Sequence, residues 1–281
     1  MKLIPLPESR LNEAVAFSAA LCSRPELQSC PLFEAPEAIR EEYAWRFHDK
    51  NGGLMAAEED GLLAAVFCFF FLPEQRYLQT TSFHIAPGRE EAGRLFFAHL
   101  AAAYPGFRMN VILPVQNRPA ETLLKQEGFQ LQEECIDQQL KLSTLPQTAP
   151  ADDVLAVEAE NFDRYAPFHD AWYPGYFWTA ELLKANPSGW EISALQEGET
   201  LTGSVLLRCD GDLFEIFGLH APDDEAAARL LSTALARSRC RHPEGRVALF
   251  GVEPDNARNL RAAKACGFSM RSHYRCWSKA L

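Results

Sequence analysis

The hydrophobic and polar positions of residues 117–129, NRPAETLLKQEGF, predict a short capped helix. Asn117 is a residue type that caps a helix by accepting a hydrogen bond from its first turn. Leu123 and Leu124 lie on the face of this helix that can be buried. Gly128 can adopt the left-handed backbone that commonly ends a helix. Taken alone, the stretch predicts a helix with a start and a stop.

The longest apolar run, LLAAVFCFFFL at 62–72, predicts a strand. Its length and aromatic content are typical of a strand that is buried on both faces. A helix needs roughly 20 apolar residues to cross a bilayer, so this run is too short to do so. The first residues, MKLIPLPESRLNEA, also lack the long apolar segment of a secretion signal. We therefore expect a cytoplasmic protein that makes no use of a membrane.

The capped-helix pattern occurs twice in the chain. Residues 256–268 read NARNLRAAKACGF, and Asn256, Gly267 and Phe268 each follow their counterparts in the first copy by 139 positions. A second match lies upstream, where APGREEAGRL at 86–95 resembles APDDEAAARL at 221–230 at an offset of 135. A period of about half the chain indicates a duplicated domain and not a solenoid.

The order of predicted elements is the same in both halves. Each half has a helix-rich start, then a β-hairpin, seen in EEDGLLAAVFCFFF and QEGETLTGSVLLRC, then strand, helix, strand, helix and strand. The polar, Pro-rich residues 143–153, STLPQTAPADD, lack periodicity and predict a linker. We therefore expect one domain at 1–142 and a second at 154–281. We expect the protein to be a monomer or a homodimer.

The composition of the chain limits which binding partners and metal sites are expected. The 281 residues carry a formal net charge of −11 and contain no long run of Lys and Arg, so nucleic acid is a poor partner. The eight cysteines form no C-x-x-C pair, which favours reduced thiols in a cytoplasmic protein. No spacing of His and carboxylate residues indicates a metal site.

The chain resembles the C-terminal part of the GNAT (GCN5-related N-acetyltransferase) superfamily in its order of a strand, an Asn, a helix, a Gly-Phe pair and a closing strand. The resemblance covers essentially the whole chain, twice. It implies an α/β (α+β mixed) fold of two GNAT-like domains, each with a central mixed, mostly antiparallel sheet flanked by helices. It also implies acetyl-CoA as co-substrate, held where the fourth and fifth strands splay apart. The diphosphate of acetyl-CoA would meet the N–H groups at the start of the following helix, because these donors are unpaired and the helix dipole is positive there.

The family's diphosphate signature, Gln or Arg, two residues, Gly, one residue, and Gly or Ala, is intact in neither copy. By resemblance, the second copy would bind acetyl-CoA through Gly218, Leu219, His220, Ala226, Ala228, Arg229, Asn256 and Asn259. The alternative site in the first copy would use Ile85, Gly88, Arg89, Gly93, Arg94 and Asn117. In the second copy, Asp223, Asp224 and Glu225 place negative charge beside the expected diphosphate.

Catalysis in this family needs a base, and often a Tyr that returns a proton to the leaving thiolate. The resemblance assigns the base to Glu215, seven residues before Pro222, and the equivalent position in the first copy is Thr80. A Glu at this place in a strand can equally be an ordinary solvent-facing residue. The Tyr position is occupied by Leu124 in one copy and Ala263 in the other.

An aromatic stretch, YAPFHDAWYPGYFW at 165–178, is the candidate acceptor site. Clusters of this kind are often core, but Pro174 and Gly175 prevent an uninterrupted helix, and loops rich in Trp and Tyr are typical of binding walls. The candidate acceptor-binding residues are Trp172, Tyr173, Tyr176 and His169.

Three hypotheses follow. In the first, the second domain transfers acetyl from acetyl-CoA to a primary amine of a small molecule or peptide, with Glu215 as base, and the first domain is mainly structural. In the second, both copies have lost CoA binding and the protein is a non-catalytic ligand-binding or interaction module. In the third, the protein transfers an acyl or aminoacyl group to a larger substrate, although the acidic charge disfavours an aminoacyl-tRNA donor.

Overall fold

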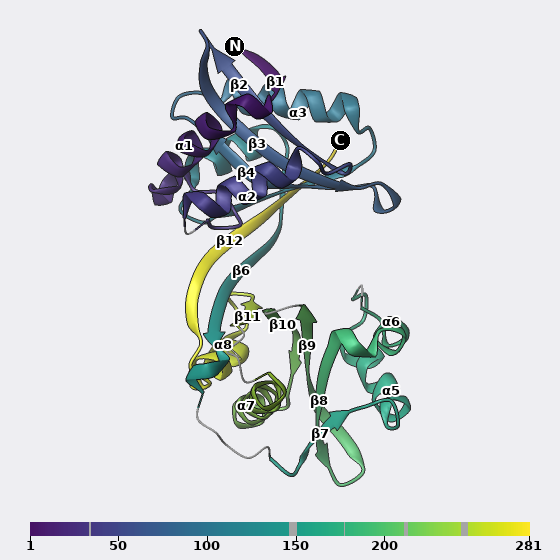
Figure 1. Ribbon diagram of the computed structural model, residues 1–281. Helices are drawn as coiled ribbons and strands as arrows, with labels where there is room; N and C mark the ends of the chain where they lie inside the picture. The colour runs from purple at the N-terminus through teal and green to yellow at the C-terminus, as the bar shows by residue number, and fades with distance from the viewer. Residues whose placement is uncertain (34, 146–150, 177, 211–212, 243–246) are drawn as a thin grey trace. The chain divides into compact units, whose positions relative to one another are not determined.

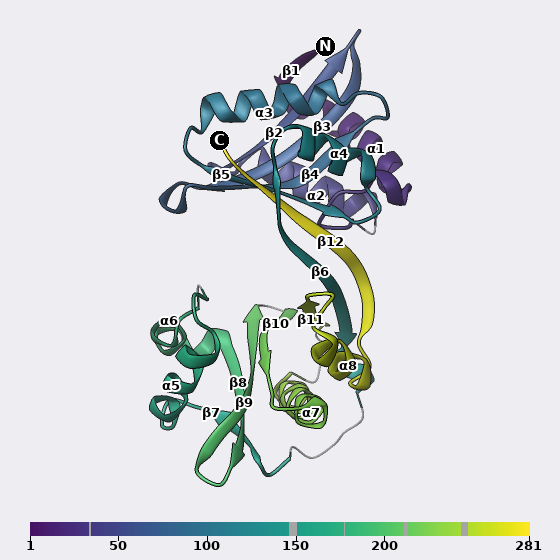
Figure 2. The same ribbon diagram turned by 180° about the vertical axis from the view of Figure 1, so that it is seen from behind.

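The computed structural model describes the whole chain except residues 34, 146–150, 177, 211–212 and 243–246. It divides into two compact units, unit 1 comprising Met1–Glu134 with Ser272–Leu281, and unit 2 comprising Cys135–Arg271. Figures 1 and 2 show each unit as a sheet with helices on both faces.

The two units have the same order of elements. Unit 1 contains β1 (Lys2–Pro5), α1 (Leu11–Cys22), α2 (Pro36–Arg46), β2 (Gly52–Glu59), β3 (Leu62–Leu72), β4 (Tyr77–Ile85), α3 (Glu91–Ala103), β5 (Arg108–Pro114) and α4 (Arg118–Gln126). Unit 2 contains β7 (Val154–Val157), α5 (Phe162–Trp172), α6 (Ala180–Ala185), β8 (Trp190–Glu197), β9 (Thr200–Asp210), β10 (Leu213–His220), α7 (Asp224–Arg241), β11 (Val247–Val252) and α8 (Ala257–Ala265). The long strands β6 (Gln130–Lys141) and β12 (Ser269–Ala280) each have residues in both units, and short 3₁₀ turns lie at Glu8–Arg10, Pro25–Leu27, Pro73–Gln75, Leu142–Thr144 and Pro187–Gly189.

The predicted fold class and duplication are confirmed. Each sheet is antiparallel except for one parallel pair, β4 with β5 in unit 1 and β10 with β11 in unit 2. The strand predicted at 62–72 is β3. The helix-rich starts of the two halves also contain the four-residue strands β1 and β7, which the prediction missed.

The last strands of the two copies are exchanged. Residues Ile136–Lys141 of β6 pair with β11 in unit 2, whereas Tyr274–Ala280 of β12 pair with β5 in unit 1. In Figure 1 the yellow β12 can be followed from α8 to the strands of unit 1. The units therefore differ from the predicted domains 1–142 and 154–281, because β12 completes the sheet of unit 1 rather than that of its own half. Part of the predicted linker 143–153 lies outside the described residues.

Two hydrophobic cores cover the faces of each sheet. In unit 1, α1 and α2 pack on one face around Ile39 and Tyr43, and α3 and α4 pack on the other around Phe96 and Leu123. In unit 2, α5 and α6 pack on one sheet face around Phe162 and Trp190, whereas α7 and α8 cover the opposite face.

The capped helices form as predicted in both copies. Asn117 accepts a hydrogen bond from Ala120 N at 3.1 Å, and Asn256 accepts one from Asn259 N at 3.2 Å. The equivalent glycines, Gly128 and Gly267, have φ of 84° and 90°, a conformation that costs glycine little.

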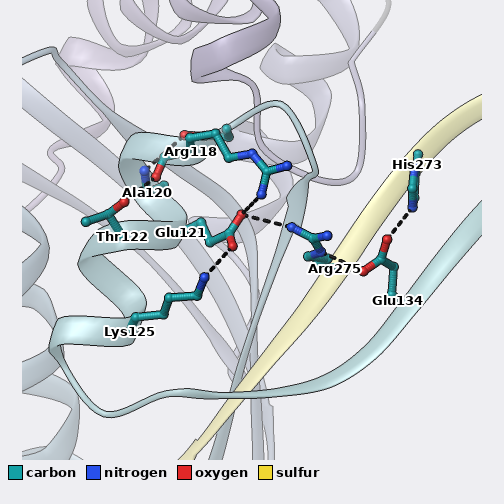
Figure 3. A network of polar contacts seen from close by, with 9 residues as sticks. Arg118, Ala120, Glu121, Thr122, Lys125, Glu134, His273 and Arg275 are labelled. Carbon is teal, nitrogen blue, oxygen red and sulfur yellow. Dashed lines mark hydrogen bonds and ion pairs between the residues drawn. The ribbon is translucent and has the colours of Figure 1, made fainter.

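An ion-pair network on unit 1 holds the exchanged β12 (Figure 3). Arg275 Nε lies 2.7 Å from Glu134 Oε2, and Arg275 Nη1 lies 3.1 Å from Glu121 Oε2 on α4. The Glu121 carboxylate is nearly buried and also contacts Arg118 and Lys125, at 2.8 and 2.7 Å. Because a buried carboxylate needs its partners, these contacts stabilise β12 on unit 1.

We expect Arg275→Ala to lower the free energy of unfolding by roughly 1–3 kcal/mol, because it removes two charged hydrogen bonds and leaves Glu121 and Glu134 less well paired. Urea unfolding monitored by circular dichroism measures the change. Arg118→Ala is the matched control: its side chain is 62% exposed, so removing it should cost less than about 1 kcal/mol. Equal effects of the two changes would contradict this role of Arg275.

Candidate functional site

In both units the two parallel strands separate after a short paired stretch. In unit 1, β4 pairs with β5 over Tyr77–Gln79 and Arg108–Asn110. In unit 2, β10 pairs with β11 over Leu213–Ile216 and Val247–Phe250. We call the unpaired region beyond each stretch the unit 1 gap and the unit 2 gap. Backbone groups that face a gap need other hydrogen-bond partners.

The unit 1 gap is filled by the chain itself. Phe83 N–H on β4 donates to Ser29 Oγ at 2.9 Å, and Cys30 N–H donates to Ile112 O on β5 at 3.3 Å. Ser29 and Cys30 are both buried. Residues 28–30 thus bond to both strands and take the place of the missing strand-to-strand hydrogen bonds.

The residues of the alternative cofactor site in the first copy are engaged within unit 1. Asn117 donates through Nδ2 to Gln28 O at 2.7 Å, in addition to capping α4. The remaining predicted residues are Ile85, Gly88, Arg89, Gly93 and Arg94, of which Arg89 pairs with Glu59 at 2.5 Å and Arg94 with Glu127 at 3.2 Å. A Cβ on Gly93 would lie 2.5 Å from Leu123 Cδ2, so Gly93 serves the packing of α3 on α4. These contacts occupy Arg89, Gly93 and Arg94, whereas Ile85, Gly88 and Asn117 line a cavity of about 170 Å³.

A buried polar cluster lies beside the end of β4. Tyr43 Oη is 2.8 Å from Ser18 Oγ and 3.4 Å from His84 Nδ1, and Cys22 Sγ is 3.2 Å from His84 Nε2. Burial lowers the pKa of His84 to about 4, so the imidazole is neutral near pH 7. Ser18, Tyr43 and His84 are buried and Cys22 is partly exposed, so the cluster has the character of a core network.

The unit 2 gap has different neighbours. Asn259 Nδ2 donates to Leu219 O at 3.1 Å, and Arg258 Nη1 donates to Ala221 O. In the described part of the chain, Leu219 and Ala221 thus accept hydrogen bonds from side chains of α8, which Asn256 caps. The connection between α5 and α6, residues 173–179, is also shorter than its counterpart 23–35 in unit 1, which contains residues 28–30.

The register of β10 corrects one predicted equivalence. Both strands carry a bulge: pairing shifts between Ile216 and Gly218 on β10, and between Thr80 and Ser82 on β4. Aligning the bulges makes Gly218 the equivalent of Ser82 and Glu215 the equivalent of Gln79. The prediction that Thr80 corresponds to Glu215 is therefore wrong by one residue, because the loop after the strand is shorter in the second copy.

Glu215 lies on the sheet face that α5 and α6 cover, with an exposed side chain. Partial desolvation by nearby protein raises the pKa of Glu215, Arg208 on the neighbouring strand acts to lower it, and Asp137 acts to raise it further. Phe217 lies on the same face and contacts Trp190, with ring centroids 5.4 Å apart. The face therefore presents a carboxylate beside aromatic rings.

The same face continues toward the end of β10 under residues of α5. A Cβ on Gly218 would lie 2.7 Å from Tyr173 Cε1, so this position requires glycine. The rings of Trp172 and His220 stack with centroids 3.8 Å apart. Burial lowers the pKa of His220, and the positive charge of Arg258 lowers it further.

The four predicted acceptor residues fall into two classes. His169 is buried and bonded to Tyr165 Oη at 3.2 Å and to Trp178 O at 2.8 Å. Tyr173 is buried too, with its hydroxyl 3.2 Å from Ser204 Oγ. Trp172 and Tyr176 are exposed, at 53% and 45%. The aromatic stretch is thus partly core and partly surface, and Phe177 lies outside the described residues.

The start of α7 is occupied by acidic side chains. Asp223 Oδ1 accepts from Ala226 N at 2.8 Å, and Asp224 pairs with Arg261 at 2.7 Å. Two further predicted cofactor residues, Ala228 and Arg229, line a cavity with residues such as Cys266, which follows α8. The structure therefore brings Gly218, Leu219, His220, Asn256 and Asn259 together around the unit 2 gap, but it places Ala228 and Arg229 elsewhere.

Sequence reasoning missed several residues of these sites. The alternation in LFEIFGLH places Phe217 on the same face as Glu215, a signal that was available. Arg208 and Trp178 come from other elements, with Arg208 Cζ 5.4 Å from the Trp178 ring centre. Nothing in the local pattern of residues 28–30 predicts their place in the unit 1 gap.

The two residues at the positions of the missing Tyr cannot contact a substrate. Leu124 on α4 and Ala263 on α8 are both fully buried in the hydrophobic cores.

In the described part of the chain, no helix is long and apolar enough to cross a membrane. The described residues also contain no group of three His, Cys, Asp or Glu side chains placed to hold a metal ion.

The comparisons with known proteins rest on structure, since no family model and no curated protein matches the sequence. A GCN5-related N-acetyltransferase from Sphaerobacter thermophilus superposes with a TM-score of 0.65 at 16% identity, covering 99% of this chain and 95% of that one. A tandem GNAT protein from the clavulanic acid biosynthesis pathway gives 0.53 at 16% identity over 99% and 98% of the two chains. A GNAT-family acetyltransferase from Colwellia psychrerythraea gives 0.50 at 10% identity over 99% and 98%. Over its full length, therefore, this chain has the GNAT fold in its tandem, duplicated form.

Proposed function

We propose that unit 2 is an N-acyltransferase that transfers an acetyl group from acetyl-CoA to a primary amine of a small molecule or peptide, and that unit 1 has a mainly structural role. The observation that carries the proposal is the contrast between the two gaps. The unit 1 gap is filled by residues 28–30, whereas the unit 2 gap lies next to the exposed Glu215. The GNAT fold supports the reaction class at the level of fold alone.

The unit 2 gap fits the arm of acetyl-CoA, which supplies the acyl thioester when bound. Leu219 is the equivalent of Phe83, whose N–H points into the unit 1 gap and donates to Ser29 Oγ. The matching register directs the N–H of Leu219 into the unit 2 gap, where it can polarise a carbonyl oxygen. Asn256 and Asn259 lie at the other side of this gap, on α8.

The start of α7 does not fit the diphosphate of acetyl-CoA. The N–H of Ala226 already donates to Asp223, and Asp224 and Glu225 add negative charge to the first turn. An anion there would meet like charge and a satisfied donor. We therefore assign no role in catalysis to this helix end.

Glu215 is suited to take the proton of the acceptor amine. Its exposed carboxylate can receive an ammonium group, and its raised pKa makes it a better proton acceptor than an ordinary Glu. Phe217 and Trp178 lie beside it, with ring centroids 6.5 Å apart, and aromatic faces attract organic cations. Trp172 and Tyr176 provide further exposed aromatic surface for the acceptor.

Acetyl-CoA should protect the backbone amides of unit 2 residues 217–221 from hydrogen exchange and leave those of unit 1 residues 81–85 unchanged, because residues 28–30 already fill the unit 1 gap. Hydrogen–deuterium exchange with mass spectrometry, with and without millimolar acetyl-CoA, measures both segments in one sample. Protection of β4 instead would assign the cofactor to unit 1. Protection of neither would remove the enzyme proposal.

Glu215→Gln should lower turnover by about 10²-fold or more, a typical loss for a general base, without changing acetyl-CoA affinity. In the unsubstituted protein, turnover should rise with pH through a pKa above the usual 4.5, because only the ionised carboxylate accepts a proton. That limb of the pH profile should vanish in Glu215→Gln. Glu197→Gln, at an exposed position on β8, is the matched control and should behave as the unsubstituted protein does. A pH limb that persists in Glu215→Gln would take Glu215 out of the reaction.

A second candidate function, a non-catalytic module that has lost CoA binding, is favoured by the acidic cap at Asp223. Asp223→Ser separates the two, because Ser keeps a cap oxygen and removes the charge. If the charge limits binding, this variant should bind acetyl-CoA several-fold more tightly and acetyl-pantetheine, which lacks the diphosphate, unchanged. Calorimetry with both ligands measures this. If neither ligand binds to either protein, the non-catalytic function is the correct one.

A further inference from the structure

A cavity of about 200 Å³ lies in unit 2, at the side where β7 and β8 meet α6 and the second half of α7. Its apolar wall consists of side chains that include Phe162, Leu183, Trp190 and Ile192. None of the residues that line it belongs to β10 or β11. The cavity lies on the β7 and β8 side of unit 2, and nothing in the proposed function uses it, although Trp190 also contacts Phe217.

Three cationic side chains, from α6 and α7, also line the cavity, and two of them are paired. Lys184 Nζ lies 2.6 Å from Asp163 Oδ1. Arg241 lies 3.0 Å from Glu158 and 3.6 Å from Glu191. These pairs neutralise the charges of Lys184 and Arg241 within the protein.

The third cation, Arg237, bonds to neutral groups. Its Nη1 donates to the buried Ser193 Oγ at 3.2 Å, and its Nη2 donates to Val154 O. Within the described ranges of the chain, no carboxylate forms an ion pair with it. Burial lowers the pKa of Arg237, the charge of Arg241 lowers it further, and Glu158 opposes this. A partly buried guanidinium without a carboxylate partner is costly, and an anion in the cavity would offset that cost.

We propose that this cavity binds a small aliphatic monocarboxylate, with its carboxylate on Arg237 and its hydrocarbon chain against Phe162, Leu183 and Trp190. One water takes roughly 30 Å³ of liquid volume, so the cavity has room for about six to eight non-hydrogen atoms. A single unpaired guanidinium matches one carboxylate in charge, and its planar fork matches it in geometry. The apolar wall favours an alkyl chain over a second polar group.

Pentanoate is the probe, because its seven non-hydrogen atoms match the cavity. We expect it to bind the full chain with a dissociation constant of about 1 mM, the weak affinity that so small a ligand allows. Titration followed by two-dimensional ¹H–¹⁵N NMR should shift the Trp190 indole signal. Pentan-1-ol, which has the same chain without the charge, should bind about tenfold more weakly or not at all. Equal binding of pentan-1-ol, or no binding of pentanoate at 20 times the expected constant, overturns the proposal.

Arg237→Gln should weaken pentanoate binding by about tenfold or more, since it removes the charge and keeps a donor for Ser193. Lys184→Gln is the matched control, because Lys184 lines the same cavity but is already paired with Asp163, and it should change binding less than twofold. Circular dichroism checks that both variants are folded. Unchanged affinity in a folded Arg237→Gln variant would refute the site. Because no CoA ligand is used, the result is independent of whether unit 2 is an acyltransferase.

Discussion

Each sheet in this protein is completed by a strand that the other half of the sequence contributes, and the remaining structure depends on this exchange. β5 has its antiparallel partner in β12, and β11 has its partner in β6. Without these partners β5 and β11 would be edge strands with unpaired backbone groups. Because β5 and β11 also form one side of each gap, the exchange holds in place the strands on which both candidate sites are built. The network around Glu121 and Arg275 anchors the exchanged strand on unit 1 with charged contacts.

The same region of the duplicated fold is built differently in the two units. In unit 1 the long connection between α1 and α2 inserts residues 28–30 into the gap, and the polar groups of Ser18, Tyr43 and His84 are buried in the core. In unit 2 the connection is shorter, and side chains of α8 reach β10 instead. Unit 1 has internal hydrogen bonds at the place where unit 2 has a strand end beside the exposed carboxylate of Glu215. Loop length, rather than any single catalytic residue, separates the two.

In unit 2, acidic side chains lie both near β10 and at the start of α7. Near β10, the negative charge of Glu215 lies opposite Arg208, whereas that of Asp137 is paired with Arg271. At the start of α7, Asp223 and its neighbours place the same sign of charge where an anionic cofactor would need the opposite. The strand register preserves in Leu219 the backbone donor that the proposed reaction needs.

The repeat of 117–129 at 256–268 was enough to establish the duplication, the element order and the Asn and Gly ends of α4 and α8, because caps and periodicity are local properties of the chain. Gly218 and Glu215 were also identifiable as candidates, since they follow from strand alternation and the family pattern. The exchange of β6 and β12 was not, because backbone hydrogen bonds join any two suitable strands and the two copies offer equivalent edges. The filling of the unit 1 gap was equally hidden: Ser29 meets Phe83 across 54 positions of sequence, and only tertiary packing brings them together.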